Sequence, residues 1–282
     1  MSGDQQPVSG AGEAKPQKTK AEDNPWYLLA TLYGVGQHDK NRRAWNRYFS
    51  ASLDEETRAK LVEEKRHPAE ELRLFSSEEF QEVATAFAER AQVSTKNLLI
   101  PKPNEVIDFS NVQFDQGVSF HKYLFGPCSF EEATFSARAI FARVSFSGYA
   151  QFKGVTFCGL AAFFDASFGY AFFNGAIFSK KKAEERADFR KAKFSGDADF
   201  SGATFYGEAV FDRSTFSGET KFDGRAEFRG LSSFVNAKME GKTSFEGTTF
   251  KSKPPQFFGA GLHEGTVWPA LKTWPVPRAY PY

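Results

Sequence analysis

The sequence predicts a mainly β protein, a solenoid of stacked coils with a small N-terminal α-helical cap, and three observations lead to this fold class. First, from about residue 107 to 250 the chain repeats a small residue, one residue of any kind and Phe, as in Ala133-Thr-Phe135. Second, these Phe residues fall alternately five and six positions apart, so the full period is eleven. Third, turn-forming pairs such as Ser201-Gly202 follow many of them. Fixed-period similarity of this kind is typical of repeat architectures.

Each repeat unit is predicted to be a strand of about three residues followed by a corner. The small residue and the Phe stand two positions apart, so both point inward, and the residue between them, such as Thr134 or Asp199, points outward. Such strands are too short for a β-sandwich, so we expect a solenoid in which Phe lies above Phe. An eleven-residue period also suits a helical supercoil, but the inward positions would scatter around a helix.

The size of a coil follows from the size of the Phe ring. Two Phe rings could hardly fit into one eleven-residue ring, so two units should form a coil of about four sides. Counting sides from Phe109 to Phe250 gives between six and seven coils, a rod of about 30 Å at the strand spacing. Each buried Phe contributes roughly 1.5–3 kcal/mol, offset by chain entropy. The predicted interior is filled with rings, which argues against a ligand cavity and an enzyme.

Two stretches carry a resemblance to a known family. Residues 187–191 (ADFRK) and 198–202 (ADFSG) match the Ala-[Asp/Asn]-[Leu/Phe]-x-x consensus of the pentapeptide-repeat family, which the chain resembles over about half its length. The resemblance implies that family's right-handed quadrilateral β-helix, with the small residue and the Phe inside. The chain departs from the pattern in carrying Phe where many members carry Leu, and in an extra residue on every second side. For that residue we expect a bulge at one corner per two sides.

The segment also looks like a Phe-rich bacterial subgroup with an N-terminal helical segment. Longer members of that subgroup continue, after a Trp-Pro-rich stretch, into helices and membrane spans. Val267-Trp268-Pro269 resembles the start of that continuation, which suggests a short or truncated relative.

Four segments are predicted in chain order: a disordered tail (1–22), a helical cap (23–95), the pentapeptide-repeat β-helix (104–258) and a Trp/Pro-rich C-terminal tail (259–282). The first tail is rich in Gly, Ala, Lys, Pro, Gln and Glu, a composition typical of disorder. In the cap, Asn24-Pro25 predicts a helix start, and Gly34 and Gly36 end that helix. Since the end of a solenoid exposes strand edges and rings, we expect the helices to cover the first coil.

Three further helices are predicted in the cap. One starts near Asp39 and places Trp45, Tyr48 and Phe49 on one face. The second starts at a capping box of Ser52 and Glu55 and ends before Pro68. The signals for the third are a capping box and an apolar stripe, formed by Ser76 with Glu79 and by Phe80, Val83, Ala84 and Phe87.

The charge balance weighs against nucleic-acid roles. The chain has 36 basic and 35 acidic residues, and residues 105–250 contain 17 Lys plus Arg and 18 Asp plus Glu, a net charge of minus one. Some members of the resembled family protect topoisomerases by mimicking duplex DNA, which needs a strongly acidic surface. A sequence-independent DNA binder needs a basic surface instead. Neither charge excess is present, so both readings are disfavoured.

No catalytic, cofactor-binding or metal-binding residue is predicted, and no cofactor is expected. Gly34-Val-Gly36 lacks the third glycine of a dinucleotide-binding loop. The four His residues (38, 67, 121 and 263) are scattered, which favours surface or capping roles. Cys128 occupies a small inward position and should be buried, whereas Cys158 follows a Phe at a corner and is expected to be exposed. The two cysteines suggest neither a disulfide framework nor a metal site.

Two outward features stand out. Residues 179–186 are highly charged, and we expect one side's core residue to be replaced there, giving a protruding or frayed side. A loose ladder of hydroxyls could suggest ice binding, but in a coil of twenty-two residues alternate members fall on opposite sides, and Ile177 and Lys193 interrupt it. The ladder consists of Thr134, Ser145, Thr156, Ser167, Thr204 and Thr215.

The leading functional prediction is a non-enzymatic scaffold that mediates protein–protein interaction, with another protein as partner and no small-molecule substrate. One alternative is a detached cytoplasmic regulatory module of a membrane protein, and another is the disfavoured DNA mimic. Pro254-Pro255, Phe257-Phe258, Trp268 and Trp274 are expected to form the opposite cap or a homodimer contact. No signal peptide and no apolar stretch of about 20 residues is evident. We therefore expect a cytoplasmic protein that reaches membranes only through partners.

Overall fold

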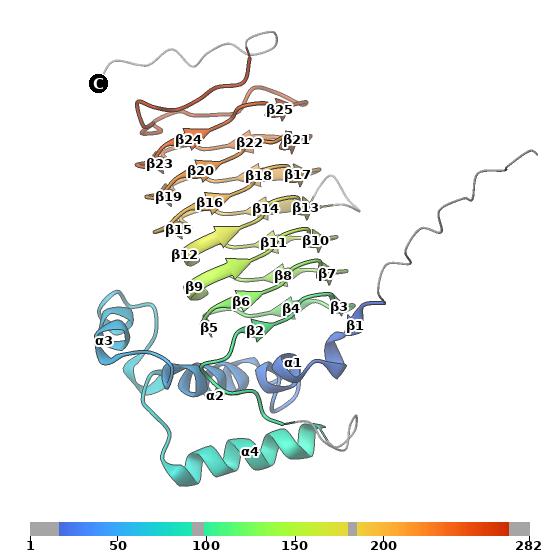
Figure 1. The fold of residues 1–282 in the computed structure, drawn as a ribbon, viewed down its shortest axis with the longest axis vertical. Coiled ribbons are helices and arrows are strands. Elements are labelled where there is room, and N and C mark those ends of the chain that lie inside the picture. The colour runs from blue at the N-terminus through green and yellow to red at the C-terminus, as the bar shows by residue number, and fades with distance from the viewer. Residues whose placement is uncertain (1–16, 92–98, 180–184, 271–282) are drawn as a thin grey trace, which may run out of the picture.

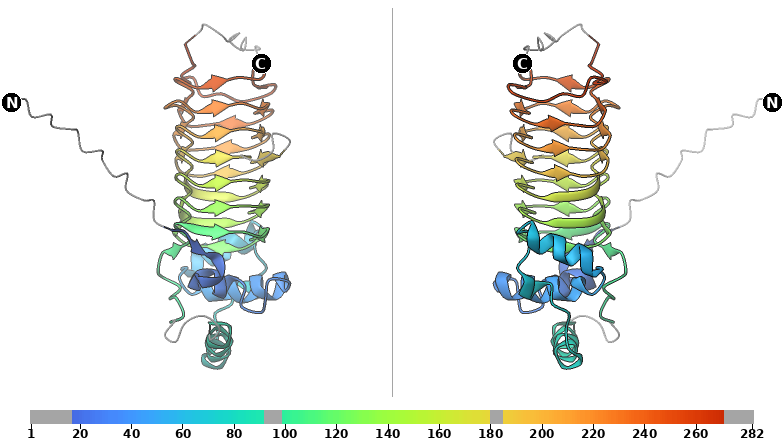
Figure 2. Two further views of the ribbon diagram at one scale, coloured as in Figure 1. Left: turned by 90° about the vertical axis from the view of Figure 1, so that its right-hand side faces the viewer. Right: turned by 90° about the vertical axis from the view of Figure 1, so that its left-hand side faces the viewer.

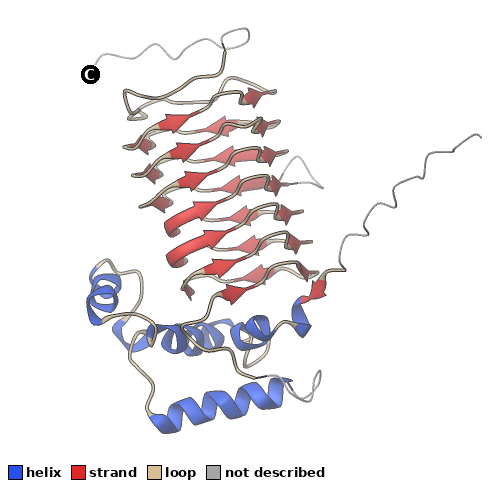
Figure 3. Ribbon diagram, viewed as in Figure 1, coloured by secondary structure: helices blue, strands red, loops and turns tan. Residues whose placement is uncertain are grey.

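The computed structural model describes residues 17–91, 99–179 and 185–270 (Figure 1). Helices gather at one end, and a straight rod of stacked coils extends from them (Figure 2). Apart from the short strand β1, which precedes the helices, the strands follow the helices in the chain (Figure 3). The fold is a parallel β-solenoid of about six turns with a few N-terminal helices, as the sequence predicts. The right-handed sense implied by the resemblance stays a prediction.

The described residues of the helical cap form four α-helices and two 3-10 helices. The start of α1 is confirmed, since the Asn24 side chain accepts a hydrogen bond from the Tyr27 N–H at 3.1 Å and Pro25 is the first helical residue. The capping box of Ser76 and Glu79 is also confirmed, with both reciprocal bonds present. The helices are η1 (Ala21–Asp23), α1 (Pro25–Ala30), α2 (His38–Ser50), α3 (Glu55–Glu63), η2 (Ala69–Glu71) and α4 (Ser77–Ala91).

Two expectations for this end are wrong. The cap of α3 is Asp54, whose carboxylate accepts from the Thr57 N–H at 2.6 Å, whereas the Ser52 hydroxyl donates to the Phe49 carbonyl at the end of α2. The tail expected to be disordered through residue 22 is ordered earlier. Strand β1 (Thr19–Lys20) pairs with the first coil, and Ala21 behind it is buried.

The strands form four columns around the axis, here called faces 1 to 4 in the order in which the chain visits them. Face 1 contains β2 (Ile107–Asp108), β6 (Cys128–Ser129), the second halves of β9 (Ser145–Gln151) and β12 (Ser167–Phe172), β16 (Ala198–Asp199), β20 (Thr220–Lys221) and β24 (Thr243–Ser244). Face 2 contains β3 (Val112–Phe114), β7 (Thr134–Phe135), β10 (Thr156–Phe157), β13 (Ile177–Phe178), β17 (Thr204–Phe205), β21 (Glu227–Phe228) and β25 (Thr249–Phe250).

Face 3 contains β4 (Val118–Ser119), β8 (Ala139–Ile140), β11 (Ala161–Ala162), β14 (Arg186–Asp188), β18 (Glu208–Val210) and β22 (Ser232–Ser233). Face 4 contains β5 (Leu124–Phe125), the first halves of β9 and β12, β15 (Lys193–Phe194), β19 (Thr215–Phe216) and β23 (Lys238–Met239). Pairing between coils is parallel on all four faces, and like residues pair, as Phe135 does with Phe157.

The core is a set of stacked Phe rings. On face 3, the ring of Phe163 lies 4.9 Å from those of Phe141 and Phe189, with interplanar angles of 4° and 2°. Across the axis it meets Phe152 and Phe173 of face 1 edge-on, at 5.5 and 5.4 Å. Offset stacks and edge-to-face pairs are the favoured arrangements of aromatic rings. The Phe repeat therefore fills the axis of the rod, as predicted.

Two of the four corners are tight turns. Between faces 1 and 2 and between faces 3 and 4, two residues separate the Phe of one side from the small residue of the next, and the second of the two has positive φ; the coil of Phe222 has three residues there. Gly154 (63°) and Gly175 (67°) occupy this position at the first corner, and Lys191 (59°) and Arg213 (58°) at the second. The small residue donates its N–H back to the Phe carbonyl, as Ala133 does to Phe130 at 3.0 Å. This is β-turn geometry, which explains the turn-forming residues in the sequence.

The other two corners hold the extra residue. At the corner between faces 4 and 1, the coil of β12 has one residue fewer than that of β9, and the β9–β12 register shifts between Phe168 and Tyr170. The bulge expected at the extra residue stays a prediction. Glycines line this corner because consecutive coils nearly touch there. A Cβ on Gly218 would lie 2.4 Å from the carbonyl carbon of Gly196, and one on Gly241 would lie 2.0 Å from the carbonyl oxygen of Gly218. Here glycine is required by close approach, not by positive φ.

Gly218→Ala is therefore expected to lower the free energy of unfolding by about 1–3 kcal/mol, because the backbone of the coil below cannot move aside. Gly126→Ala is the matched control, since Gly126 lies at the same corner of the first coil and its Cβ would meet nothing within 4 Å. Urea titration of both variants checks the prediction. Equal stability of the two would show that the coils do not pack as closely at this corner as described.

The last coil closes the C-terminal end of the core. Trp268 stacks on Phe245 at 5.4 Å with an interplanar angle of 5°, and it meets Phe257 edge-on. The aromatic column thus extends beyond residue 258, where the sequence placed the end of the β-helix. Phe258 itself is 78% exposed. Trp274 lies outside the described residues.

Candidate functional site

The cap covers the lower strand edges of three faces of the first coil. On face 2, β1 pairs in parallel with β3. On face 4, Leu124 of β5 has its N–H bonded to the Asn46 side chain at 2.8 Å, and its carbonyl accepts from the Trp45 indole at 2.7 Å. On face 1, the carbonyl of Asp108 accepts from the Asn24 side chain at 3.0 Å. This confirms that the helices cover the end of the solenoid.

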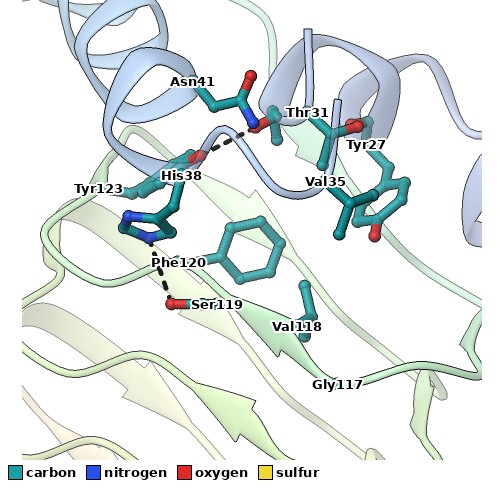
Figure 4. Close-up of a pocket in the computed structure, with 11 residues that line it drawn as sticks. Tyr27, Thr31, Val35, His38, Asn41, Gly117, Val118, Ser119, Phe120 and Tyr123 are labelled. Carbon is teal, nitrogen blue, oxygen red and sulfur yellow. Dashed lines mark hydrogen bonds between the residues drawn. The ribbon is translucent and has the colours of Figure 1, made fainter. Parts of the chain in front are cut away.

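Beside the fourth edge, that of β4 on face 3, lies a pocket of about 310 Å³ (Figure 4). Helix α1, the loop after it and the start of α2 form one side, and β4 forms the other. The lining combines aromatic and aliphatic side chains with a few polar groups. The residues that matter most are Tyr27, Val35, His38, Val118, Ser119 and Tyr123.

His38 is the one histidine among the residues that line this pocket. Its Nε2 lies 3.2 Å from the Ser119 hydroxyl, and its ring lies 5.7 Å from that of Tyr123 and 6.3 Å from that of His121. Burial lowers the pKa of His38, and the attraction of Asp39 only partly offsets this. The imidazole is therefore neutral at pH 7 and can donate or accept one hydrogen bond. Two of the four scattered His residues thus come together, which their sequence spacing did not indicate.

A second polar cluster holds the cap against face 4. Arg42 forms a buried ion pair with Glu71, and Glu71 also accepts from the Asn46 side chain at 2.8 Å. His67 Nε2 lies 2.9 Å from the Ser145 hydroxyl. Burial, together with Arg66 and Arg42, lowers the pKa of His67 to about 3, so this ring is neutral at pH 7.

The Ser145–His67 contact has the geometry of a nucleophile and its base, but its surroundings do not suit catalysis. Both side chains are only 2% exposed, so a substrate cannot reach the hydroxyl. The pair serves to satisfy two polar groups inside the interface between cap and rod. The sequence gives no sign of the pair, because its members lie 78 residues apart and belong to no motif.

Both cysteines are buried. Cys128 lies inside, as predicted, and burial raises the pKa of its thiol well above the usual range. The expectation that Cys158 is exposed is wrong, since it is 7% exposed. Cys158 stands at the corner between faces 2 and 3, directly after Phe157. Within the described ranges, 17–91, 99–179 and 185–270, no group of three or more His, Cys, Asp or Glu could hold a metal ion.

The charged insertion lies at one corner. Phe178 is the core Phe of face 2 in its coil, and Phe189 is the core Phe of face 3 that follows it, so no side has lost its core residue, contrary to expectation. The insertion lengthens the corner between β13 and β14. Residues 180–184 lie outside the described residues. The hydroxyl ladder is divided as predicted, because Thr134 and Thr156 lie on face 2 and Ser145 and Ser167 on face 4. Ile177 and Lys193 interrupt the two columns.

Face 4 and the tight corner beside it carry a group of exposed cations, here called the basic patch: Lys191, Lys193, Arg213 and Lys238. None of the four forms an ion pair with another described residue. Lower on the same corner, Asp165 forms ion pairs with Arg143 of the rod and with Arg66 of the cap. The patch therefore begins above Asp165 and runs toward the C-terminal end.

The fold defines a repeat protein. It is a parallel β-solenoid with Phe rings along its axis and most of its polar and charged side chains on the outer surface. Residues 184–224 match a family model described as pentapeptide repeats (9 copies). The chain therefore contains pentapeptide repeats, the Phe-rich solenoid continues on both sides of the match, and a helical segment precedes it. No curated protein and no solved structure matches the chain. Over the part that the structure covers, no helix is both long and apolar enough to span a membrane.

Proposed function

We propose that this protein is a scaffold that binds another protein on the outer surface of its solenoid. The observation that carries the proposal is the filled axis, in which the Phe rings stack at about 4.9 Å and leave the rod only its faces for recognition. Proteins built from pentapeptide repeats are generally non-enzymatic scaffolds, which supports the same conclusion.

The basic patch is the surface that we propose for the partner. Its cations are exposed, and two of them have a backbone conformation that is unfavourable for any residue with a side chain. Lys191 and Arg213 have φ near +60°, whereas the corner between faces 1 and 2 has glycine at this position in several coils, as at Gly154, Gly175 and Gly202. A side chain in this conformation costs roughly 1–2 kcal/mol relative to a relaxed one, and glycine avoids the cost. Long cations kept at such positions, without ion-pair partners, suit an acidic protein surface.

The patch can be tested by reversing its charge. With Lys191, Lys193, Arg213 and Lys238 all changed to Glu, we expect capture of a partner from the native cells to fall at least about tenfold. Charges at an interface govern both the rate of association and the electrostatic match between the two surfaces. The control carries the same charge change on faces 1 and 2, at Lys153, Lys221, Arg225 and Lys251, and should keep its partner. Quantitative mass spectrometry of material cross-linked to the tagged full-length protein gives the measurement.

Three results would contradict the proposal. Equal capture by both variants would exclude the basic patch, and an absence of any specific partner would exclude the scaffold. Loss of the captured material on nuclease treatment would assign the patch to nucleic acid instead. Circular dichroism confirms that each variant is folded before it is used.

A further inference from the structure

Strand β4 is the lowest strand of face 3, and its lower edge has no strand partner. It pairs only upward, with β8. The N–H groups of Val118 and Phe120 donate to the carbonyls of Arg138 and Ile140 above, at 2.9 and 2.7 Å. Alternate residues of a strand direct their backbone groups to opposite edges, so the N–H and the carbonyl of Ser119 point downward. Neither group has a hydrogen-bond partner among the described residues.

This edge differs from the other three. The cap supplies β1 to face 2, the Asn24 side chain to face 1, and the Trp45 and Asn46 side chains to face 4. On face 3 it supplies only the contact of His38 with the Ser119 hydroxyl. Natural proteins cover exposed strand edges because an unpaired edge is a template for another strand. The cap therefore leaves one strand position open.

The open position adjoins the pocket. In Figure 4, His38 lies over Ser119, and the side chains of Val118, Val35 and Tyr27 surround the space beside them. The lining is mainly apolar, with Phe120 and Tyr123 completing it. A backbone edge bordered by an apolar pocket is the arrangement that recognises an extended peptide: the main chain supplies hydrogen bonds and the pocket selects a side chain.

We propose that an extended segment of a partner protein binds here as an added strand along the lower edge of β4, with one apolar or aromatic side chain in the pocket. This inference rests on the proposed function and names the form that the partner takes at the end of the rod. The molecule contains its own precedent on the neighbouring face. There, a strand of two residues, Thr19–Lys20, adds to β3, and the next residue, Ala21, is buried behind it.

The described part of this chain does not supply the strand. Lys18, the residue before β1, lies away from β4, since its side chain reaches the Glu132 carbonyl at the corner between faces 1 and 2. The last described residues lie at the opposite end of the rod, beyond Trp268 (Figure 1). A segment of another chain is therefore the occupant we infer.

The experiment uses the full-length protein and a phage-displayed library of random linear peptides. The best peptide is synthesised, and its binding is measured by calorimetry together with amide hydrogen exchange at Ser119. We expect selected peptides to share an apolar or aromatic residue flanked by extended sequence, and to slow exchange of the Ser119 amide at least about tenfold.

Two variants separate the edge from the side chain. Ser119→Pro removes the downward N–H and leaves the bonds to β8 in place, so peptide affinity should fall at least about tenfold. Ser119→Ala keeps the N–H and should bind within about twofold. If Ser119→Pro does not fold, the exchange measurement on the unchanged protein still decides the question.

The outcomes are distinct. No selected peptide, or peptides that bind Ser119→Pro equally and leave the Ser119 amide unprotected, would overturn the inference. If such peptides bind the basic patch instead, the proposed function survives and only the added strand fails. A Ser119 amide that is protected in the free protein, and becomes unprotected when residues 1–16 are removed, would assign the edge to the chain's own N-terminus.

Discussion

Phe163→Ala is expected to lower the free energy of unfolding by about 3–5 kcal/mol. The ring is fully buried and in contact with Phe141 and Phe189 along face 3, and with Phe152 and Phe173 across the axis. Removing it leaves a void that the ladder cannot close, because the hydrogen bonds between coils fix their spacing. The loss is a large part of the 5–15 kcal/mol that typically stabilises a folded protein.

Phe172→Ala is the matched control. Phe172 stands outward on face 1, one residue before the buried Phe173, and it belongs to the same strand, β12. Its replacement should change stability by less than about 1 kcal/mol. Urea titration followed by circular dichroism measures both variants. A similar effect of the two would mean that the stacked rings do not dominate the stability of the rod.

Removal of residues 1–95 is expected to convert the protein into soluble aggregates or precipitate. The deletion removes β1 from face 2 and uncovers the backbone of Leu124 on face 4. It also exposes Phe114, Tyr123 and Phe125, which the rings of Tyr27 and Trp45 now contact. Several unpaired edges next to an apolar surface form a template for association between chains.

Light scattering coupled to gel filtration measures the effect. A milder variant, Trp45→Ala with Asn46→Ala, removes the hydrogen bonds to Leu124 and keeps the helices, so it should aggregate more slowly than the deletion. A folded, monodisperse monomer lacking residues 1–95 would show that the rod needs no cap at this end.

The solenoid could be predicted because its information is local. Each unit carries its own inward pair and its own corner, as in Ala198, Phe200 and Gly202, so the fold follows from one unit and its repetition. The buried slot of Cys128 followed from the same pattern. Burial of Cys158 did not, because the repeat specifies the inward pair of each unit and carries no signal for burial at a corner.

The junction could not be predicted in the same way. Strand β1 lies in a polar stretch, and pairing with β3 orders it, not any apolar periodicity of its own. The cluster of Arg42, Glu71, His67 and Ser145 joins residues that are far apart in the chain. The open edge of β4 is even less visible in the sequence, since Val118-Ser119-Phe120 looks like any other repeat unit. Only the absence of a covering element distinguishes it.

The lengthened corner between β13 and β14 has a consequence for the dimensions of the molecule. Phe178 and Phe205 still stack at 4.7 Å across it, so added residues leave through a corner without disturbing the ladder. The distance between the two ends of the rod thus depends on the number of whole coils alone, at about 4.8 Å for each. Gain or loss of one coil, two eleven-residue units, would therefore change the length of the rod in discrete steps.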